Sequence, residues 1–463
     1  MSALRTIWTC LITERSLGGR KVVRSKRQRR RRQRGVALIA VLTAIALTLA
    51  LTNQFGTSTN VDLIGAANYR DQMRSHFLAR SAMALSEIVI RLQQRIDNQK
   101  ELRGTQITDF ADQILLAFCG TDEEVKAAVG FTSSEAKGLG ADIGTCGIVG
   151  AFTTEDDKLN INCANGTDAV AATLKSALDA LVYFPAYDPV FEEEDAEGWR
   201  RDRATQVAAI VDYVDSDAMR NRERGTQENY NYESLKDPYK LRKAPGTPIA
   251  GGNYVDTVDE LKLVRGIDDR FWSLFGPSFT VYGGCKTNVS ALTNSQLVAA
   301  IIYLAAKNPN DPLLQNPQKL FTLAGLVAKA KQYGMMFTTL DDFADFVKDP
   351  TAQLGTLAGE SSIAGSAASA AITQGIPGIT TGEKLGIELD KTKLQQLATA
   401  GPRRTYRVVA WGEIERKQKT AEGAPVYAPI RSQITGVWDT KVVPQNVRNP
   451  PAPKGAWVYL KED

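Results

Sequence analysis

Residues 27–55 place a run of arginines, one glycine and an apolar segment end to end, and no other part of the chain limits its fold as strongly. The apolar segment, Val36 to Phe55, contains twenty residues and no charge. An α-helix of this length rises about 30 Å, which matches the thickness of the hydrocarbon core of a bilayer. The segment is therefore expected to cross a membrane once.

The residues before this segment predict its orientation. Residues 1–35 contain twelve Lys or Arg residues and one acidic residue, Glu14. Basic residues stay on the cytoplasmic side, so everything after Phe55 is expected on the far side of the membrane. The leader contributes +11 to a net charge of +4, and the difference leaves −7 on the remaining residues. An acidic remainder disfavours a protein that binds nucleic acid.

Three kinds of membrane signal compete for this segment. A secretory signal peptide should end in a small-x-small cleavage site, and only residues 46–48 or 48–50 would serve. An uncleaved anchor accounts for the apolar length but not for Gly35 at the border with the arginines. A signal that is cut after Gly35, with the helix kept in the mature chain, accounts for both features and is favoured.

This arrangement resembles the type IV pilins and the type II secretion pseudopilins. Their basic leader ends in glycine and is removed by a prepilin peptidase, while the apolar helix stays attached. The resemblance implies cleavage between Gly35 and Val36. Most members have a glutamate at the fifth mature residue, whereas this chain has Ala40. That departure resembles the minor pseudopilin K family of type II secretion systems.

Four short motifs extend the resemblance to the minor pseudopilin K family. In the family order they are an Asn-rich strand KLNIN (158–162), a helix end DYVDSD (212–217), a hairpin DELKLVRGI (259–267) and a strand KTNVSA (286–291). Each motif alone is weak, but four in order behind such a leader are specific. The resemblance runs from about Arg29 to Asp439. Departures are Ser290, where the family often has Asn, and an Ala/Gly/Ser-rich insertion at 351–382.

The pattern of hydrophobic residues predicts the elements of the fold. A stripe of apolar residues predicts one helix from Val36 to Asn98, in which Gly56 and Gly65 are expected to be the flexible positions. Alternating patterns predict strands at 151–163, 405–417 and 429–440. Helical patterns occur at 109–118, 122–129, 199–217, 257–276, 290–307 and 338–348.

The expected fold class is α+β. A pilin-like fold, in which the long N-terminal helix packs on a small antiparallel sheet, would carry a large inserted helical α-domain of SAM-like or helix-hairpin-helix-like type. The expected parts are a cleaved leader (1–35), a transmembrane and stalk helix (36–100), the first part of the head (101–163), the inserted α-domain (164–350), a flexible Ala/Gly/Ser-rich insertion (351–401) and the C-terminal strands of the head (402–463).

Cysteine usage agrees with export. Without the leader four cysteines remain, an even number in a part that is expected to face an oxidising periplasm. Three pairings are open, and we favour Cys119 with Cys146 and Cys163 with Cys285 because the first closes a short local loop. The alternative is four buried free thiols.

Acidic residues of the expected α-domain suggest a calcium site. Asp212 and Asp215 are three residues apart, hence on one face of a helix, and Asp217 follows at its expected end. Three carboxylates suit a hard ion such as Ca²⁺, with Glu228 as a conceivable further ligand. The resemblance supports this hypothesis, because family members bind calcium in the α-domain. The alternative is that these carboxylates cap backbone amides or pair with nearby arginines.

No catalytic residues are expected. The one histidine, His76, lies on the long helix, so the head lacks a Ser-His-Asp or Cys-His arrangement. No glycine-rich phosphate loop lies on a strand-to-helix turn. The sequence therefore favours a structural protein over an enzyme.

The resemblance implies a subunit at the tip of the type II secretion pseudopilus, because Ala40 offers no carboxylate to the N-terminal amine of another subunit. The implied partners are the minor pseudopilins I and J, the major pseudopilin, the inner-membrane assembly platform and the prepilin peptidase. The implied location is the inner membrane, with a single span at 36–55 and the head in the periplasm. Two alternatives are a minor type IV pilin at a pilus tip and a membrane-anchored periplasmic binding protein, which would keep its leader.

Overall fold

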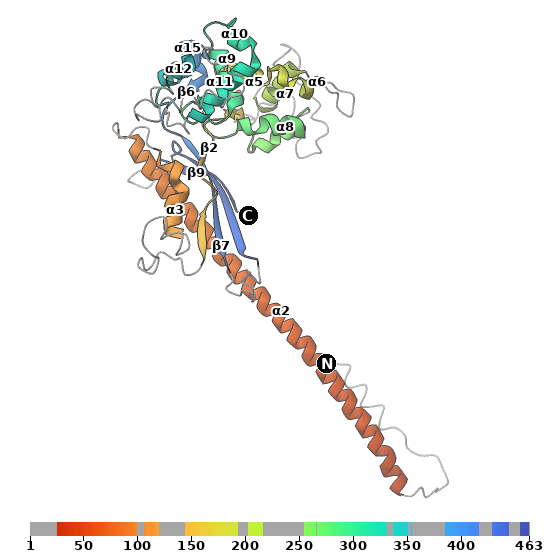
Figure 1. The fold of residues 1–463 in the computed structure, drawn as a ribbon. Helices are drawn as coiled ribbons and strands as arrows, with labels where there is room; N and C mark the ends of the chain where they lie inside the picture. The colour runs from red at the N-terminus through yellow and green to blue at the C-terminus, as the bar shows by residue number, and fades with distance from the viewer. Residues whose placement is uncertain are drawn as a thin grey trace, which may run out of the picture. The chain divides into compact units, whose positions relative to one another are not determined.

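The computed structural model is an α+β protein with one long N-terminal helix and a small antiparallel sheet (Figure 1). It describes residues 26–99, 106–119, 144–192, 202–215, 254–264, 266–330, 337–350, 353, 385–415, 428–443 and 454–462. The chain divides into two compact units, Met1–Asp71 and Gln72–Asp463.

Helix α2 (Lys26–Asp97) is 72 residues long, and Gly56 and Gly65 do not interrupt it. The prediction of one continuous helix over 36–98 is confirmed, although the helix already begins at Lys26. Within Val36–Phe55 each threonine hydroxyl donates to a carbonyl three or four residues earlier, so none of these hydroxyls is left without a partner. Among the described residues, α2 is the helix that by itself is long and apolar enough to cross a membrane.

The unit Gln72–Asp463 contains the antiparallel sheet. Its strands run in the order β1 (Thr145–Ile148), β7 (Thr405–Ile414), β8 (Ile430–Asp439) and β9 (Ala456–Glu462), and β2 (Thr153–Thr154) also pairs with β7. Strands β7 and β8 pair over their full length, from Thr405 opposite Asp439 to Ile414 opposite Ile430. The strands expected at 405–417 and 429–440 are thus confirmed, whereas β1 and β9 were not predicted from the sequence.

In this unit the last part of α2 packs on one face of the sheet. Ala79, Ala82 and Met83 are buried in a core that also contains Tyr406 and Val408 of β7. Helix α3 (Ala111–Cys119) joins the same core and corresponds to the helix expected at 109–118. The helix expected at 122–129 lies outside the described residues.

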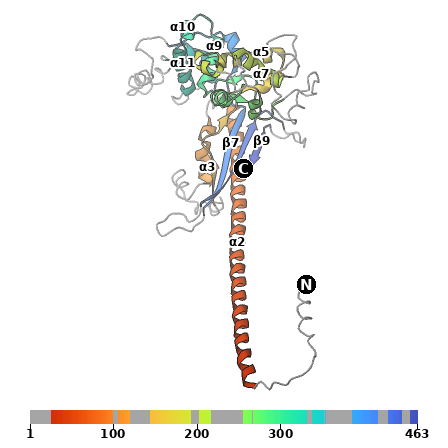
Figure 2. The same ribbon diagram turned by 90° about the vertical axis from the view of Figure 1, so that its right-hand side faces the viewer.

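A second hydrophobic core holds together the helices that lie between β3 and β7 in the sequence. Figures 1 and 2 show these helices as one group. They are α5 (Asp168–Val182), α6 (Asp188–Glu192), α7 (Arg203–Val214), α8 (Asp269–Phe275), α9 (Ser295–Ala305), α10 (Pro312–Gln315), α11 (Pro317–Lys329), α12 (Leu340–Lys348) and α15 (Lys391–Leu397), with the 3-10 helices η3 (Ile161–Asn165), η4 (Pro185–Tyr187), η6 (Val258–Leu263) and η7 (Gly276–Ser278). The helical patterns at 199–217, 290–307 and 338–348 contain α7, α9 and α12, so these three helices were predicted correctly.

Two parallel strand pairs lie within this helical group. Strand β3 (Leu159–Asn160) pairs with β4 (Phe279–Thr280), and β5 (Thr287–Asn288) pairs with β6 (Ala398–Thr399). The strand expected over 151–163 therefore consists of two short pieces, β2 and β3, which belong to different sheets.

The segment expected as a flexible insertion, 351–401, needs a correction at its end. Residues 385–401 have a defined structure: Leu385, Ile387 and Leu394 are buried in the second hydrophobic core. The physical reason is that 385–399 carries its own apolar residues at spacings that fill this core, which the Ala/Gly/Ser-rich composition of the preceding residues obscured. Of residues 351–384, only Gln353 is described.

Candidate functional site

The first candidate site is the beginning of the apolar segment of α2, at Gly35 and Val36. The bond between Gly35 and Val36 lies inside the helix, and the Val36 side chain is exposed. Ala40 presents only a methyl group at this surface, and its carbonyl accepts a hydrogen bond of 2.9 Å from the Thr43 hydroxyl. Residue 40 is therefore uncharged, and its backbone carbonyl is bonded within the helix itself.

The part of α2 that packs on the sheet approaches it closely at Gly412. A Cβ atom at this residue of β7 would lie 2.2 Å from the carbonyl oxygen of Ser75 and 2.5 Å from the amide nitrogen of Ala79. Only glycine permits this distance, so the residue type at 412 sets how near the helix lies to β7. At the edge of the sheet, Glu462 of β9 pairs with Arg80 of the helix at 3.2 Å.

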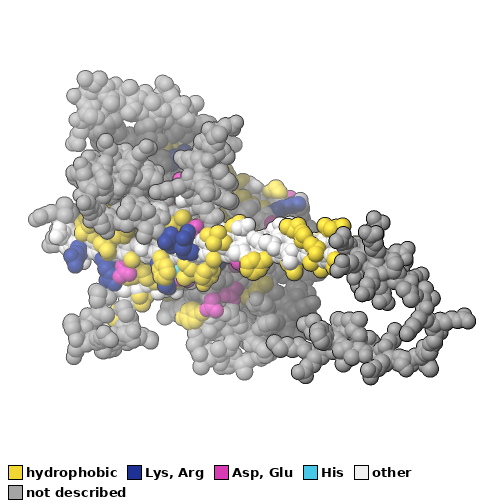
Figure 3. All heavy atoms as spheres, turned by 90° about the horizontal axis from the view of Figure 1, so that it is seen from below, with side chains coloured by type: hydrophobic (Ala, Val, Ile, Leu, Met, Phe, Trp, Pro, Cys, Tyr) yellow, Lys and Arg dark blue, Asp and Glu magenta, His cyan; other side chains and the backbone are white. Residues whose placement is uncertain are grey.

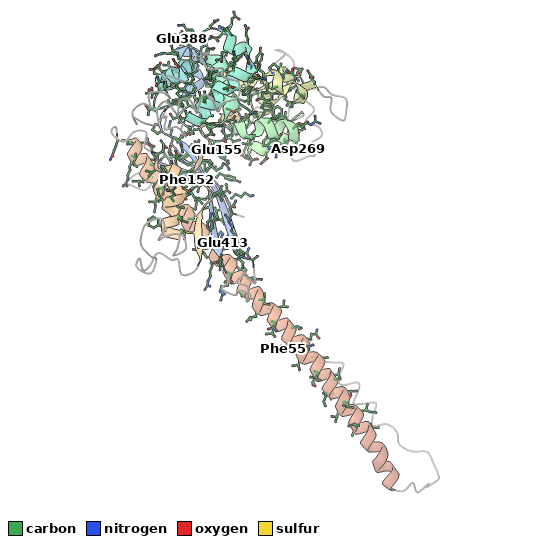
Figure 4. The ribbon with its side chains drawn as sticks, viewed as in Figure 1. Phe55, Phe152, Glu155, Asp269, Glu388 and Glu413 are labelled. Atoms are coloured by element: carbon green, nitrogen blue, oxygen red, sulfur yellow. A yellow bond between two sulfur atoms is a disulfide. The ribbon has the colours of Figure 1, made fainter. Side chains whose placement is uncertain are left out.

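A second candidate site is a group of three buried carboxylates between β2 and β3, Glu155, Asp156 and Asp157 (Figure 4 labels Glu155). Asp156 accepts hydrogen bonds from the backbone amides of Arg404 and Thr405 and a bond of 2.6 Å from the Thr405 hydroxyl. Its own carbonyl accepts from the amide of Asn288 at 2.8 Å. One residue thus joins the loop after β2, the start of β7 and strand β5.

Burial sets the protonation of this group. Desolvation raises the pKa of Asp156 although its carboxylate accepts three hydrogen bonds. Desolvation also raises the pKa of Asp157, whose carboxylate accepts a hydrogen bond of 2.6 Å from the Thr293 hydroxyl. Burial also acts on Glu155, but Lys158 and Arg407 outweigh it and lower the pKa of that carboxyl. The pKa is therefore lowered for Glu155 and raised for Asp156 and Asp157, although all three carboxyl groups are buried.

Two disulfides link elements of the sheet and of the helical group. Cys119 of α3 is bonded to Cys146 of β1, and Cys163 of η3 is bonded to Cys285, five residues after β4. These are the two pairs that the sequence analysis favoured. The second bond closes a span of 122 residues, so it joins the two ends of a large part of the helical group.

The asparagines of the sequence motifs connect distant segments. The side chain of Asn162 accepts from the amide of Val255 at 2.8 Å and donates to its carbonyl at 3.0 Å. The side chain of Asn288 donates to the carbonyls of Gly401 and Pro402. In each case one amide bridges segments some hundred residues apart, which gives the Asn-rich motifs a structural role.

The hairpin motif at 259–267 uses its polar groups locally. Thr257 and Glu260 form a capping box at the start of η6, and the Asp268 carboxylate accepts from the amide of Phe271 at the start of α8. The Lys262 ammonium lies 2.7 Å from Asp259 and over the ring of Trp272. These contacts suit a packing module, in which the Lys262 ammonium is already paired.

The four residues suggested for calcium are only partly described. Asp212 is fully buried near the end of α7, and Asp215 caps that helix and is also buried. Asp217 and Glu228 lie outside the described residues. Within the described ranges, no group of three or more His, Cys, Asp or Glu side chains is arranged to hold a metal ion. Calcium binding at these residues stays a prediction.

The link between Asp156 and Thr405 was not predicted from the sequence. The EDD run at 155–157 was visible, but acidic runs are most often solvated, and the partner is 249 residues away. A signal that could have found it is the position of these carboxylates inside the strand-like segment 151–163, where alternate side chains face the interior. Comparison of the chain with protein-family models, with curated proteins and with solved structures found no match.

Proposed function

We propose that this protein is a minor pseudopilin that forms the tip of a type II secretion pseudopilus and helps to initiate its assembly. The observation that carries the proposal is α2. A single uninterrupted helix contains an uncharged, exposed segment of membrane-spanning length, Val36–Phe55, and a later segment that is buried on an antiparallel sheet. This combination is what the resemblance to pseudopilins implies for a subunit that leaves the membrane to join a fibre.

The helical group supports the minor pseudopilin K family over other pilins. It has its own hydrophobic core and lies in the sequence between strands β2 and β7, which pair with each other. This arrangement supports the proposal of a pilin-like head with an inserted α-domain. The motif residues Asn162 and Asn288 make its long-range hydrogen bonds. These bonds give a physical reason for the asparagines in the two motifs.

Ala40 supports a position at the end of the fibre. A subunit with other subunits above it would have to accept an N-terminal amine, which in an apolar environment requires a carboxylate. The exposed methyl of Ala40 cannot supply one. The proposed partners are therefore the minor pseudopilins I and J beneath it, the major pseudopilin, the assembly platform and the prepilin peptidase. The proposed location of the protein is the inner membrane, with its head in the periplasm.

The proposal is tested by the mature N terminus. The full chain is produced with and without a prepilin peptidase, and intact mass and N-terminal sequence are measured. The expected product begins at Val36 and carries an N-methyl group, and the variant Gly35→Val keeps its leader. An intact leader in the presence of active peptidase would point to a membrane-anchored binding protein, and a cut after residue 48 or 50 would point to a signal peptide.

The tip position needs a second measurement. The chain is produced together with the minor pseudopilins I and J of one type II system, and the mass of the complex is measured by native mass spectrometry. We expect one copy of this chain in each complex. A complex that contains several copies, or a chain that assembles only with itself, contradicts a capping subunit.

A further inference from the structure

Two connections of the chain lead between the sheet and the helical group, and they are bonded to each other. The first, residues 155–158, runs from β2 to β3, and the second, residues 400–404, runs from β6 to β7. Glu155, labelled in Figure 4, is the first residue of the first connection. The Asp156 carboxylate accepts a hydrogen bond from the backbone amide of Arg404 in the second connection. The two connections therefore form one joint between the sheet and the helical group.

Asp157 ties this joint to the start of α9. Its Oδ2 atom lies 2.6 Å from the hydroxyl of Thr293, which is two residues before α9. Asp157 is 5% exposed, whereas Figure 3 shows other acidic side chains at the surface, where water solvates their charge. Within the part of the chain that the structure describes, Asp157 Oδ1 is buried and has no hydrogen-bond partner. This orphaned oxygen distinguishes Asp157 from Asp156, whose two carboxylate oxygens both accept hydrogen bonds.

The surroundings of Asp157 favour its neutral form. Burial raises the pKa of Asp157 and the Glu155 charge raises it further, whereas Lys158 lowers it. Lys158 is itself paired with Glu155 at 3.1 Å. Residues 287–306, which include Thr293 and all of α9, contain no charged residue. The arginines of the joint are paired with other carboxylates: Arg407 with Glu155, and Arg404 with Asp439.

We propose that the proton on Asp157 controls how firmly this joint is closed. As the neutral acid, the Asp157 carboxyl donates its proton to the Thr293 oxygen and holds the start of α9 on the connection between β2 and β3. When the proton leaves, the Thr293 hydroxyl donates to Oδ2 instead, and the charge that reaches the orphaned Oδ1 has to be solvated. Water reaches this buried oxygen when the joint loosens. The inference does not depend on the proposed function, because it concerns contacts within Gln72–Asp463 alone.

Proton linkage gives the direction of the pH dependence. A carboxyl whose pKa is raised in the folded protein stabilises the fold below its ordinary pKa of 3.8, and this stabilisation is lost as the pH rises through the folded-state pKa. The variant Asp157→Asn stays neutral at every pH. The ratio of the unfolding constant of the wild-type chain to that of Asp157→Asn should therefore rise above pH 3.8 by up to about tenfold per pH unit, and become constant above the folded-state pKa.

The test is urea unfolding of the full chain in mild detergent at a series of pH values, followed by tryptophan fluorescence. Asp342→Asn, at the start of α12, is the matched control. Burial raises the pKa of Asp342, but hydrogen bonds from Thr338 and Thr339 outweigh it and lower that pKa. The Asp342 carboxylate therefore stabilises the fold above the ordinary pKa, and the ratio for this variant should fall as the pH rises. The two substitutions thus have opposite expected slopes.

Amide hydrogen exchange of the folded chain locates the effect. After correction for the intrinsic rate, amides of residues 155–158 and 287–297 should exchange faster in the wild-type chain as the pH rises, but not in Asp157→Asn. Thr293→Val removes a hydroxyl that favours the charged form, so the acceleration should begin at a higher pH.

Three results would overturn the inference. One is a ratio of unfolding constants for Asp157→Asn that stays constant or falls as the pH rises. Another is equal pH dependence of exchange in the wild-type chain and in Asp157→Asn. The third is acceleration at the same pH in Thr293→Val as in the wild-type chain, since a group other than Asp157 would then titrate.

Discussion

The hydroxyl oxygens of Ser75 on α2 and Ser432 on β8 lie 2.6 Å apart, in a buried hydrogen bond between residues 357 positions apart in the sequence. The Ser75 hydroxyl is also 2.9 Å from the carbonyl oxygen of Gln72. A hydroxyl has one proton, so Ser75 donates to Gln72 and accepts from Ser432. The bond fixes the helix on the sheet at the level where Gly412 allows the closest approach.

This direction of donation predicts unequal effects of two substitutions. Ser75→Ala should lower the free energy of unfolding by about 1–2 kcal/mol, because it leaves the buried Ser432 hydroxyl without an acceptor. Ser432→Ala should cost about 0.5–1 kcal/mol, since Ser75 keeps its bond to Gln72. The measurement is urea unfolding of the full chain in mild detergent, followed by tryptophan fluorescence. Ser81→Ala, at an exposed position of the same helix, serves as the control, and a larger cost for Ser432→Ala than for Ser75→Ala would refute the direction.

The glycine at 412 predicts a second effect on stability. Gly412→Ala should lower the free energy of unfolding by about 1–3 kcal/mol, because the added methyl overlaps the backbone of α2 and the helix must move. Gly325→Ala is the matched control. Gly325 lies within α11, where a Cβ meets nothing within 4 Å, so the substitution should stabilise the protein by about 0.5–1 kcal/mol through helix propensity. Equal effects of the two substitutions in the same unfolding experiment would contradict the packing described at β7.

The strands and helices that could be predicted are those whose pattern is local. Strands β7 and β8 alternate buried and less buried residues along most of their length, because one face packs on α2. Strand β9 was missed because it lies at the edge of the sheet, and Val458 and Leu460 are exposed although they are apolar. An edge strand is under less pressure to alternate, so its sequence carries a weaker signal.

The candidate site was harder to predict than the fold. The prediction of a processing site needs only local sequence, because Gly35, Val36 and Ala40 lie within six residues. The bonds of Asp156 to Arg404 and Thr405 join residues about 250 positions apart, and only the tertiary structure brings them together. The charge of Asp156 cannot be inferred from its neighbours in the sequence either, because burial dominates the shift of its pKa.

The two disulfides should contribute unequally to stability. Replacement of Cys163 and Cys285 by serine opens a loop of 122 residues, and the chain-entropy model gives a loss of about 5 kcal/mol. Replacement of Cys119 and Cys146 opens a loop of 27 residues, for which the same model gives about 3.5 kcal/mol. Urea midpoints of the two double variants, measured without reductant, give the comparison. The order would be contradicted if the Cys119/Cys146 variant were the less stable one.

The buried ion pairs of Glu155 predict a pH dependence. Lys158 and Arg407 hold the pKa of Glu155 below its ordinary value of 4.5 against the opposing effect of burial. Such a carboxylate stabilises the folded protein above its unfolded-state pKa, and this stabilisation is lost as the pH falls through the folded-state pKa. Glu155→Gln should therefore lower the free energy of unfolding by about 1.5–3 kcal/mol near neutral pH and by progressively less below pH 4.5.

The pH series needs a control for the other carboxylates. Burial raises the pKa of Asp156 and Asp157, so their contributions change with pH in the opposite direction. The contribution of Asp156 is present in both proteins and largely cancels in the difference. The Glu155 charge itself raises the pKa of Asp157, so the comparison is repeated in an Asp157→Asn background. Glu388→Gln removes an exposed pair with Lys307 and should give a smaller difference at every pH. A difference for Glu155→Gln that grows on acidification would show that its carboxyl is neutral in the folded protein.

The exposed apolar segment of α2 predicts how the chain partitions into membranes. Ile45 lies at the middle of Val36–Phe55, where a lysine costs about 2.5–3.5 kcal/mol on insertion. Ile45→Lys should therefore reduce the fraction of the chain that stays in the membrane pellet after carbonate extraction. Asn60→Lys adds the same charge beyond the span and should leave that fraction unchanged. If both variants remained in the pellet like the wild-type chain, residues 36–55 would not be the segment that holds the protein in the bilayer.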